Sequence, residues 1–165
     1  MGLLARLRSF LPPREEINIG RRVPTFLYRW EIVSILGGQL RVYLHKFVGS
    51  DGTVDLHDHP KRFWSIGLRG WYREHLADGT TRVYRAPWIR TFPAEHRHRT
   101  SGPTPQTPCW TLVVVGQPVR EWGFWVPFER GLEFVGWKTY VAPGSAYADA
   151  GVAAVKDQQP CPGRA

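Results

Sequence analysis

From Thr25 onwards, segments rich in β-branched and aromatic residues alternate with short groups of turn residues. The segments that we expect to form strands span 26–35, 40–48, 62–69, 71–76, 81–84, 88–92, 110–115 and 120–128. Gly37-Gly38, Gly70 and Asp78-Gly79 separate successive segments, and such residues favour hairpin turns because they tolerate positive φ. The pattern therefore predicts an all-β domain built from short strands and hairpins.

The two ends of the chain have different patterns. Within residues 1–13, leucines recur at helical spacing before two prolines, which predicts a short N-terminal helix that packs against the domain. Residues 143–165 are small, polar and interrupted by proline and glycine, which predicts a flexible, disordered tail. The predicted domain therefore spans 14–142. No apolar run has the length needed to span a bilayer, so we expect no transmembrane segment.

The composition is that of one globular domain of 165 residues, with 42% hydrophobic and 22% charged residues. We expect the tryptophans at 64, 71, 88, 110, 122, 125 and 137 to fill the barrel and its mouth, with stacking on a flat substrate as the alternative. The net charge of +8 is compatible with a nucleic-acid partner, but a basic surface is the favoured interpretation because the charges are spread along the chain. Cys109 and Cys161 do not form a disulfide framework, which favours a cytoplasmic protein.

Two stretches, 56–60 and 95–99, hold four of the six histidines. In a strand His57 and His59 point to the same side, with Cβ atoms roughly 6–7 Å apart. Two imidazoles at that spacing can share one metal ion. A third ligand must come from a distant part of the chain, and His98 is the favoured candidate, with His96 of the same strand parity as the alternative. A solvent-exposed histidine pair on an ordinary strand is the competing interpretation.

These histidines and the glycines around them resemble the first motif of the cupin superfamily. Gly52, His57, His59 and Gly70 match the glycine, the paired histidines and the later glycine of that motif. The resemblance implies a double-stranded β-helix, a jelly-roll barrel that holds one metal ion. The glutamate ligand of the family would fall at Phe63, which leaves a site of three histidines.

The second cupin motif, a proline followed by a glycine and a histidine, is similar to the stretch from Pro93 to His98, with Glu95 in the place of the glycine. This match is the reason for preferring His98 to His96. The sequence around these motifs is similar to that of the three-histidine thiol dioxygenases. Val113 and Val115, however, stand where those enzymes carry a histidine and a tyrosine. As a whole the chain resembles small cupin proteins of bacteriophages and prophages.

Further residues are candidates for the pocket of such a barrel. Glu74 is a candidate fourth ligand or general base if it faces inward, and a surface carboxylate otherwise. Tyr43 and His45 share one face of a strand, and the sequence leaves open whether that face looks inward. The candidate substrate-binding residues are Tyr43, His45, Phe63, Tyr72, His96 and Trp110.

Three neutral ligands leave the full charge of a divalent ion in place and leave coordination positions open. We therefore expect a divalent transition metal at His57, His59 and His98, with Fe(II) preferred and zinc or nickel as alternatives. The predicted function is a metal-dependent enzyme for a small-molecule substrate, with a non-haem Fe(II) oxygenase ahead of an isomerase or hydrolase. The alternative is a non-enzymatic module that binds a small ligand, a protein or nucleic acid. Because many cupins pair as dimers, the resemblance also allows a homodimer.

Overall fold

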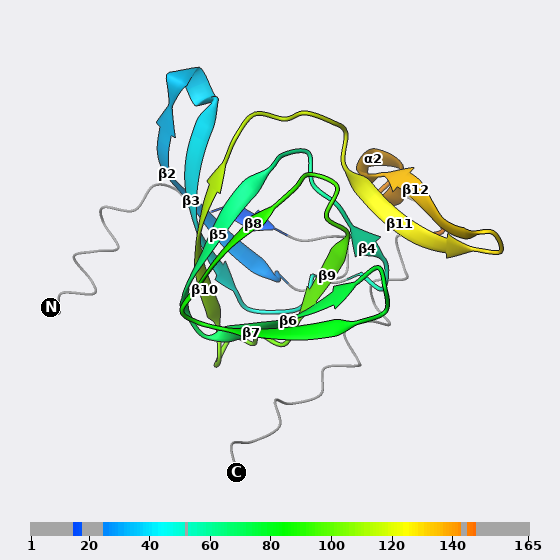
Figure 1. Cartoon of the computed structure of the whole chain (residues 1–165), viewed down its shortest axis with the longest axis horizontal. Coiled ribbons are helices and arrows are strands. Elements are labelled where there is room, and N and C mark those ends of the chain that lie inside the picture. The colour runs from blue at the N-terminus through cyan, green and yellow to red at the C-terminus, as the bar shows by residue number, and fades with distance from the viewer. Residues whose placement is uncertain (1–14, 18–24, 52, 143–144, 148–165) are drawn as a thin grey trace, which may run out of the picture.

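The computed structural model describes residues 15–17, 25–51, 53–142 and 145–147, which fold mainly into β-strands (Figure 1). Sheet 1 consists, in spatial order, of β1 (Glu15–Ile17), β2 (Leu27–Ile35), β3 (Leu40–Phe47), β10 (Cys109–Val115), β5 (Phe63–Arg69) and β8 (Trp88–Phe92). Sheet 2 consists of β12 (Gly131–Gly136), β11 (Gly123–Phe128), β4 (Leu56–His57), β9 (His98–Ser101), β6 (Trp71–Leu76) and β7 (Thr81–Arg85). The pairings within both sheets are antiparallel.

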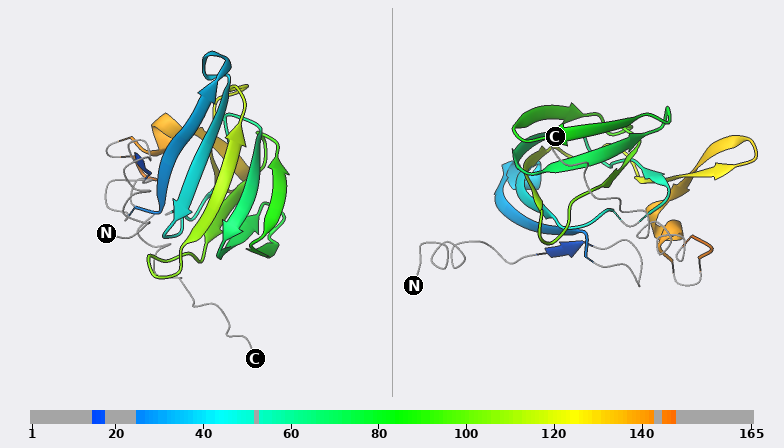
Figure 2. Two further views of the ribbon diagram at one scale, coloured as in Figure 1. Left: turned by 90° about the vertical axis from the view of Figure 1, so that its left-hand side faces the viewer. Right: turned by 90° about the horizontal axis from the view of Figure 1, so that it is seen from below.

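Successive segments of the chain pass from one sheet to the other. β3 in sheet 1 is followed by β4 in sheet 2, and β5 in sheet 1 is followed by β6 in sheet 2. The chain crosses in the same way from β8 to β9 and from β10 to β11. The two sheets face each other around a common interior (Figure 2). This alternation gives a jelly-roll barrel, so the predicted all-β architecture is confirmed.

The crossing from β5 to β6 depends on one glycine. Gly70 has φ of +87°, and a Cβ atom built on it would lie 2.4 Å from the carbonyl oxygen of Pro108. A side chain at this position would therefore collide with backbone that belongs to the neighbouring crossing. The hairpin between β2 and β3 turns at a 3-10 helix, η1 (Leu36–Gly38), as the glycine pair predicts.

Alternate residues of the sheet 1 strands face the interior. Tyr43 and His45 of β3 line the cavity inside the barrel, which settles the question of strand face that the sequence leaves open. Trp110 of β10 has the opposite orientation and stacks on Trp30 of β2, with ring centroids 6.0 Å apart. Trp64 is also on the outside and is 49% exposed. The tryptophans therefore do not all fill the core as expected, because strand parity places part of them on the outer face.

β11, β12 and the helix α2 (Trp137–Tyr140) form an arm beside the barrel (Figure 1). Its core is the buried side chain of Phe124, which stacks on Tyr140 at a centroid distance of 3.7 Å. The hydroxyl of Tyr140 donates a 2.8 Å hydrogen bond to Asp55, just before β4. Tyr147 stacks in turn on Tyr140, so packed residues continue at least to that position. The arm therefore contacts β4, the strand that carries His57, through strand pairing and through the bond of Tyr140 to Asp55.

The expected N-terminal helix over 1–13, Gly52 of the first motif and most of the expected tail over 143–165 lie outside the described residues. Within the described part of the chain, no helix is both long enough and apolar enough to cross a membrane.

Candidate metal centre

Strand pairing in sheet 2 brings the two histidine stretches together. His57 ends β4 and is the direct antiparallel partner of His98, which begins β9. His59 follows β4, and its backbone N–H donates a 3.0 Å hydrogen bond to the carbonyl of Ala94. The ligand atoms of the three imidazoles all lie within 4.8 Å of one another. Three histidines from two distant stretches of sequence therefore meet at one point inside the barrel.

The spacing of the ring nitrogens suits a shared ion. Nε2 of His59 and Nε2 of His98 are 2.9 Å apart. Two nitrogens bound to one ion at about 2.1 Å and at right angles would be about 3.0 Å apart. The observed distance therefore needs little adjustment to accommodate a metal.

The protonation of the site also suits a metal, because a ligating imidazole must be neutral. Burial lowers the pKa of His57 and of His59 well below the usual 6.5, and the neighbouring histidines lower it further. Burial also lowers the pKa of His98, although the carboxylate of Glu74 opposes this shift. At neutral pH the three rings are therefore neutral, so each has one nitrogen that can bind an ion.

Glu74 lies behind His98, on the side away from His59. Its Oε1 accepts hydrogen bonds from Nδ1 of His98 at 2.6 Å and from Nε2 of His96 at 2.9 Å, and its Oε2 accepts one from Arg90 at 2.9 Å. Burial would raise the pKa of Glu74, but these hydrogen bonds and the charge of Arg90 outweigh it and lower the pKa. Glu74 therefore faces inward as an ionised residue that contacts His98 rather than the cavity.

The same three groups, Glu74, His96 and His98, form a second set whose ligand atoms lie within 4.8 Å of one another. Glu74 is fully buried and already bonded to Arg90 in this set. The first set opens onto the cavity, whereas Glu74 and His96 do not line it. The three-histidine set is thus the one that a bound ion and a ligand can share.

A second buried carboxylate lies beside His57. Oδ2 of Asp51 is 3.5 Å from Nδ1 of His57 and accepts a 2.6 Å hydrogen bond from the backbone N–H of Thr100. Burial raises the pKa of Asp51 to about 7, against the lowering effect of that hydrogen bond. Nδ1 of His57 has no hydrogen-bond partner among the described residues. If His57 binds an ion through Nε2, Asp51 is therefore the acceptor nearest to its Nδ1.

Asp58 stands between the two histidines in the sequence but points away from them. Its carboxylate accepts hydrogen bonds from the backbone N–H of Gly123 and from Nε1 of Trp125, both at 2.9 Å, and pairs with Arg120. The side chain is completely buried. Asp58 therefore holds the histidine segment against β11 instead of serving as a ligand.

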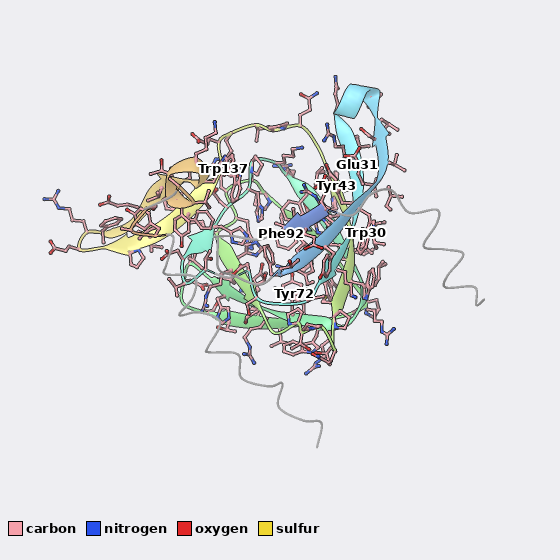
Figure 3. The ribbon with its side chains drawn as sticks, turned by 180° about the vertical axis from the view of Figure 1, so that it is seen from behind. Trp30, Glu31, Tyr43, Tyr72, Phe92 and Trp137 are labelled. Atoms are coloured by element: carbon pink, nitrogen blue, oxygen red, sulfur yellow. The ribbon has the colours of Figure 1, made fainter. Side chains whose placement is uncertain are left out.

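The three histidines open onto a cavity of about 650 Å³ inside the barrel. Tyr43, His45, Phe63 and Tyr72 line this cavity, and Figure 3 shows Tyr43, Tyr72 and Phe92 inside the ring of strands. Trp110 does not line it, so its predicted contact with a substrate is wrong for the reason of strand parity given above. His96 does not line it either and bonds to Glu74 instead, which removes it from the candidate substrate contacts.

The structure adds residues that the sequence analysis did not single out. Arg90 donates to Glu74 and, at 2.6 Å, to the hydroxyl of Tyr72, which joins the back of the metal site to the cavity wall. Arg29 and Thr111 line the cavity from β2 and β10. Each lies on the inward parity of its strand, but the sequence does not say which strands are neighbours.

No protein-family model matches the sequence, and no curated protein matches it. The structure is similar to that of the polyketide cyclase RemF from Streptomyces resistomycificus, with a TM-score of 0.56 and 14% identity over 85% of this chain and 87% of that one. A cupin-2 domain containing protein from Shewanella frigidimarina has a TM-score of 0.45 at 12% identity, over 71% of this chain and 94% of that one. Fe(II) HppE has a TM-score of 0.49 at 9% identity, over 62% of this chain and 56% of that one. Such identities show the fold alone. The chain has a jelly-roll barrel fold similar to that of RemF, and proteins described as cupins are among the structures that it resembles.

Proposed function

We propose that this chain is a metal-dependent cupin enzyme in which His57, His59 and His98 hold one divalent transition ion. The observation that carries the proposal is the meeting of three neutral imidazoles, one buried and two partly buried, at the wall of a cavity of about 650 Å³. A cavity of this size suits a small-molecule substrate. Histidines with a purely structural role would not need to line a cavity.

Imidazole ligands suit iron, zinc and nickel, and we propose Fe(II) as the native ion. When bound, Fe(II) supplies the redox chemistry of a non-haem oxygenase, whereas zinc or nickel supplies a Lewis acid. The proposed ligand set consists of three neutral imidazoles and contains no carboxylate, so a bound ion would keep its full positive charge. Such a site leaves positions on the ion open for a donor atom of the substrate.

The protein side chains supply orientation and exclusion of water. The hydrogen bond from Nδ1 of His98 to Glu74 keeps the hydrogen of that ring on Nδ1 and leaves Nε2 free. Phe63 and Phe92 stack at a centroid distance of 4.7 Å beside the ring of His59. These rings make the wall next to the histidines apolar, which keeps bulk water away from the reacting groups.

The test is elemental analysis by mass spectrometry of untagged protein reconstituted anaerobically with Fe(II). We expect about one equivalent of metal in the wild-type protein and loss of it in the His57/His59/His98→Ala triple variant. His75→Ala is the matched control, because His75 bonds to Ser101 on β9 and takes no part in the site. Circular dichroism of each variant checks that the barrel is retained.

Unchanged metal content in the triple variant would contradict the proposal. Loss of metal in His96→Ala together with full content in His57→Ala would move the site to the second set of Glu74, His96 and His98. Iron bound as expected but without oxygen consumption on a panel of small aromatic and thiol substrates would contradict the oxygenase assignment and leave metal binding in place.

A further inference from the structure

One row of polar side chains crosses the inner face of sheet 1. Arg29 of β2 is the direct partner of His45 on β3, and His45 is the direct partner of Thr111 on β10. All three line the cavity. We call these residues the polar row. It lies on the sheet opposite to the one that carries His57 and His98.

Two members of the polar row each have a buried side-chain atom without a hydrogen-bond partner among the described residues. Thr111 is 1% exposed, and its Oγ1 has no partner among the described residues. Nε2 of His45 is likewise buried without a partner in the described part of the chain. Buried polar atoms are almost always paired, so two neighbouring unpaired ones at a cavity wall point to a bound group that completes them.

The third member supplies charge. Arg29 forms an ion pair with Glu15 through an exposed contact, and its guanidinium lies 4.9 Å from the ring centre of Tyr43. Because Glu15 shares the charge, the row offers about one positive charge or less. His45 adds none, since burial and the charge of Arg29 lower its pKa to about 3. Such a row matches a monoanion with two acceptor oxygens better than a dianion.

The rest of the cavity wall is mainly apolar. Phe47, Phe63, Phe92 and Val113 are among the residues that line it. Facing sheets lie about 10 Å apart, which leaves room for a ring or a short carbon chain between an acid group on one side and a reacting group on the other.

We propose that the cavity binds a small monocarboxylic acid with an apolar or aromatic body, whose carboxylate contacts the polar row and whose other end faces the three histidines. The second contact rests on the proposed function, whereas the first rests on the polar row alone. Because Nε and Nη2 of Arg29 already donate to Glu15, Arg29 would bind the carboxylate through the Nη1 side of its guanidinium, and His45 and Thr111 would each donate one hydrogen bond to it.

The test uses 3-phenylpropionate as the probe and its neutral analogue 3-phenylpropionamide, titrated calorimetrically into the full chain. Both metal-free and zinc-loaded protein are used, so that binding to the row is separated from binding to the ion. We expect saturable binding of the acid in both forms and at least tenfold weaker binding of the amide. Phenyl phosphate, a dianion near neutral pH, is expected to bind more weakly than the acid.

Thr111→Val removes the unpaired hydroxyl and keeps the shape of the side chain. We expect it to weaken binding of the acid about fivefold without lowering the melting temperature, because no hydrogen bond within the protein is lost. Arg29→Gln should weaken binding at least tenfold, whereas Arg82→Gln, an exposed change on β7, should leave it unaltered.

Equal affinities for acid and amide, tighter binding of phenyl phosphate, or wild-type affinity in both Thr111→Val and Arg29→Gln would overturn the proposal. Absence of acid binding to both protein forms at millimolar concentration would overturn it as well. Row-dependent binding to metal-free protein would support it even if elemental analysis finds no metal, so the two proposals fail separately.

Discussion

The carboxylate of Glu74 accepts a 2.6 Å hydrogen bond from Nδ1 of His98 in a fully buried setting. This contact decides which nitrogen of His98 carries the hydrogen. With Nδ1 as the donor, Nε2 is free to act as a ligand and lies 2.9 Å from Nε2 of His59. Glu74, which does not line the cavity, therefore sets the tautomer of one of the proposed metal ligands.

Glu74→Gln tests this role. The amide oxygen can still accept the hydrogen bond, but the negative charge that raises the basicity of His98 is lost. We expect the dissociation constant for zinc to rise roughly 10- to 100-fold. Competition against a chromophoric chelator measures it, with Glu133→Gln on the exposed strand β12 as the control. An unchanged constant in a folded Glu74→Gln protein would show that Glu74 serves the fold alone.

Asp58→Asn tests the attachment of the histidine segment to β11. The substitution removes the charge that pairs with Arg120 and leaves one acceptor for the donors of Gly123 and Trp125. We expect the free energy of unfolding to fall by about 2–3 kcal/mol, the range for hydrogen bonds to a charged group. Urea unfolding measures the loss. The exposed Asp78→Asn should change stability by less than about 0.5 kcal/mol, and an equal loss in both variants would contradict the assignment.

His45 makes stability depend on pH. Its pKa is lowered from 6.5 to about 3 by burial and by Arg29, so it stays neutral in the folded protein while the unfolded chain takes up a proton below about pH 6.5. Stability is therefore lost as the pH falls, by about 1.4 kcal/mol per pH unit between those two values. We expect His45→Gln to reduce the loss between pH 7.5 and pH 5 by about 2 kcal/mol. Urea midpoints at the two pH values measure it, and equal losses in both proteins would refute it.

Gly70 and Gly79 form a matched pair for testing the crossing between the sheets. Both have positive φ, of 87° and 79°, but a Cβ at Gly70 would meet the backbone of Pro108 whereas one at Gly79 would meet nothing within 4 Å. We expect Gly79→Ala to lower stability by about 1 kcal/mol and Gly70→Ala by at least 3 kcal/mol. Urea unfolding distinguishes them, and similar losses would show that the backbone at Pro108 yields easily.

The sequence predicts the barrel well because its strands alternate with clear turn signals. The hairpin of β2 and β3 turns at η1, where the glycine pair predicts it. The hairpin predicted around Gly70 is wrong, because β5 and β6 belong to different sheets and Gly70 lies at the crossing between them. Strand parity also predicts that His57 and His59 face one way, and the structure brings them together with His98. Their role as ligands stays a prediction.

Other parts of the site depend on which strands are neighbours, and local sequence does not carry that information. The inward face of β3, with Tyr43 and His45, follows from its position between β2 and β10. The bond of Glu74 to His98 follows from the pairing of β6 with β9. Trp110 has the aromatic character of a pocket residue, but its orientation depends on the register of β10, which places it outside.

The division of the cavity between the two sheets has a consequence for evolution and for engineering. The histidines come from 57–59 and 98, whereas the polar row comes from 29, 45 and 111. Selection could therefore change the proposed ligand preference through one set of strands without altering the proposed metal ligands on the other. A library randomised at the polar row would test new ligands on a scaffold whose three histidines are unchanged.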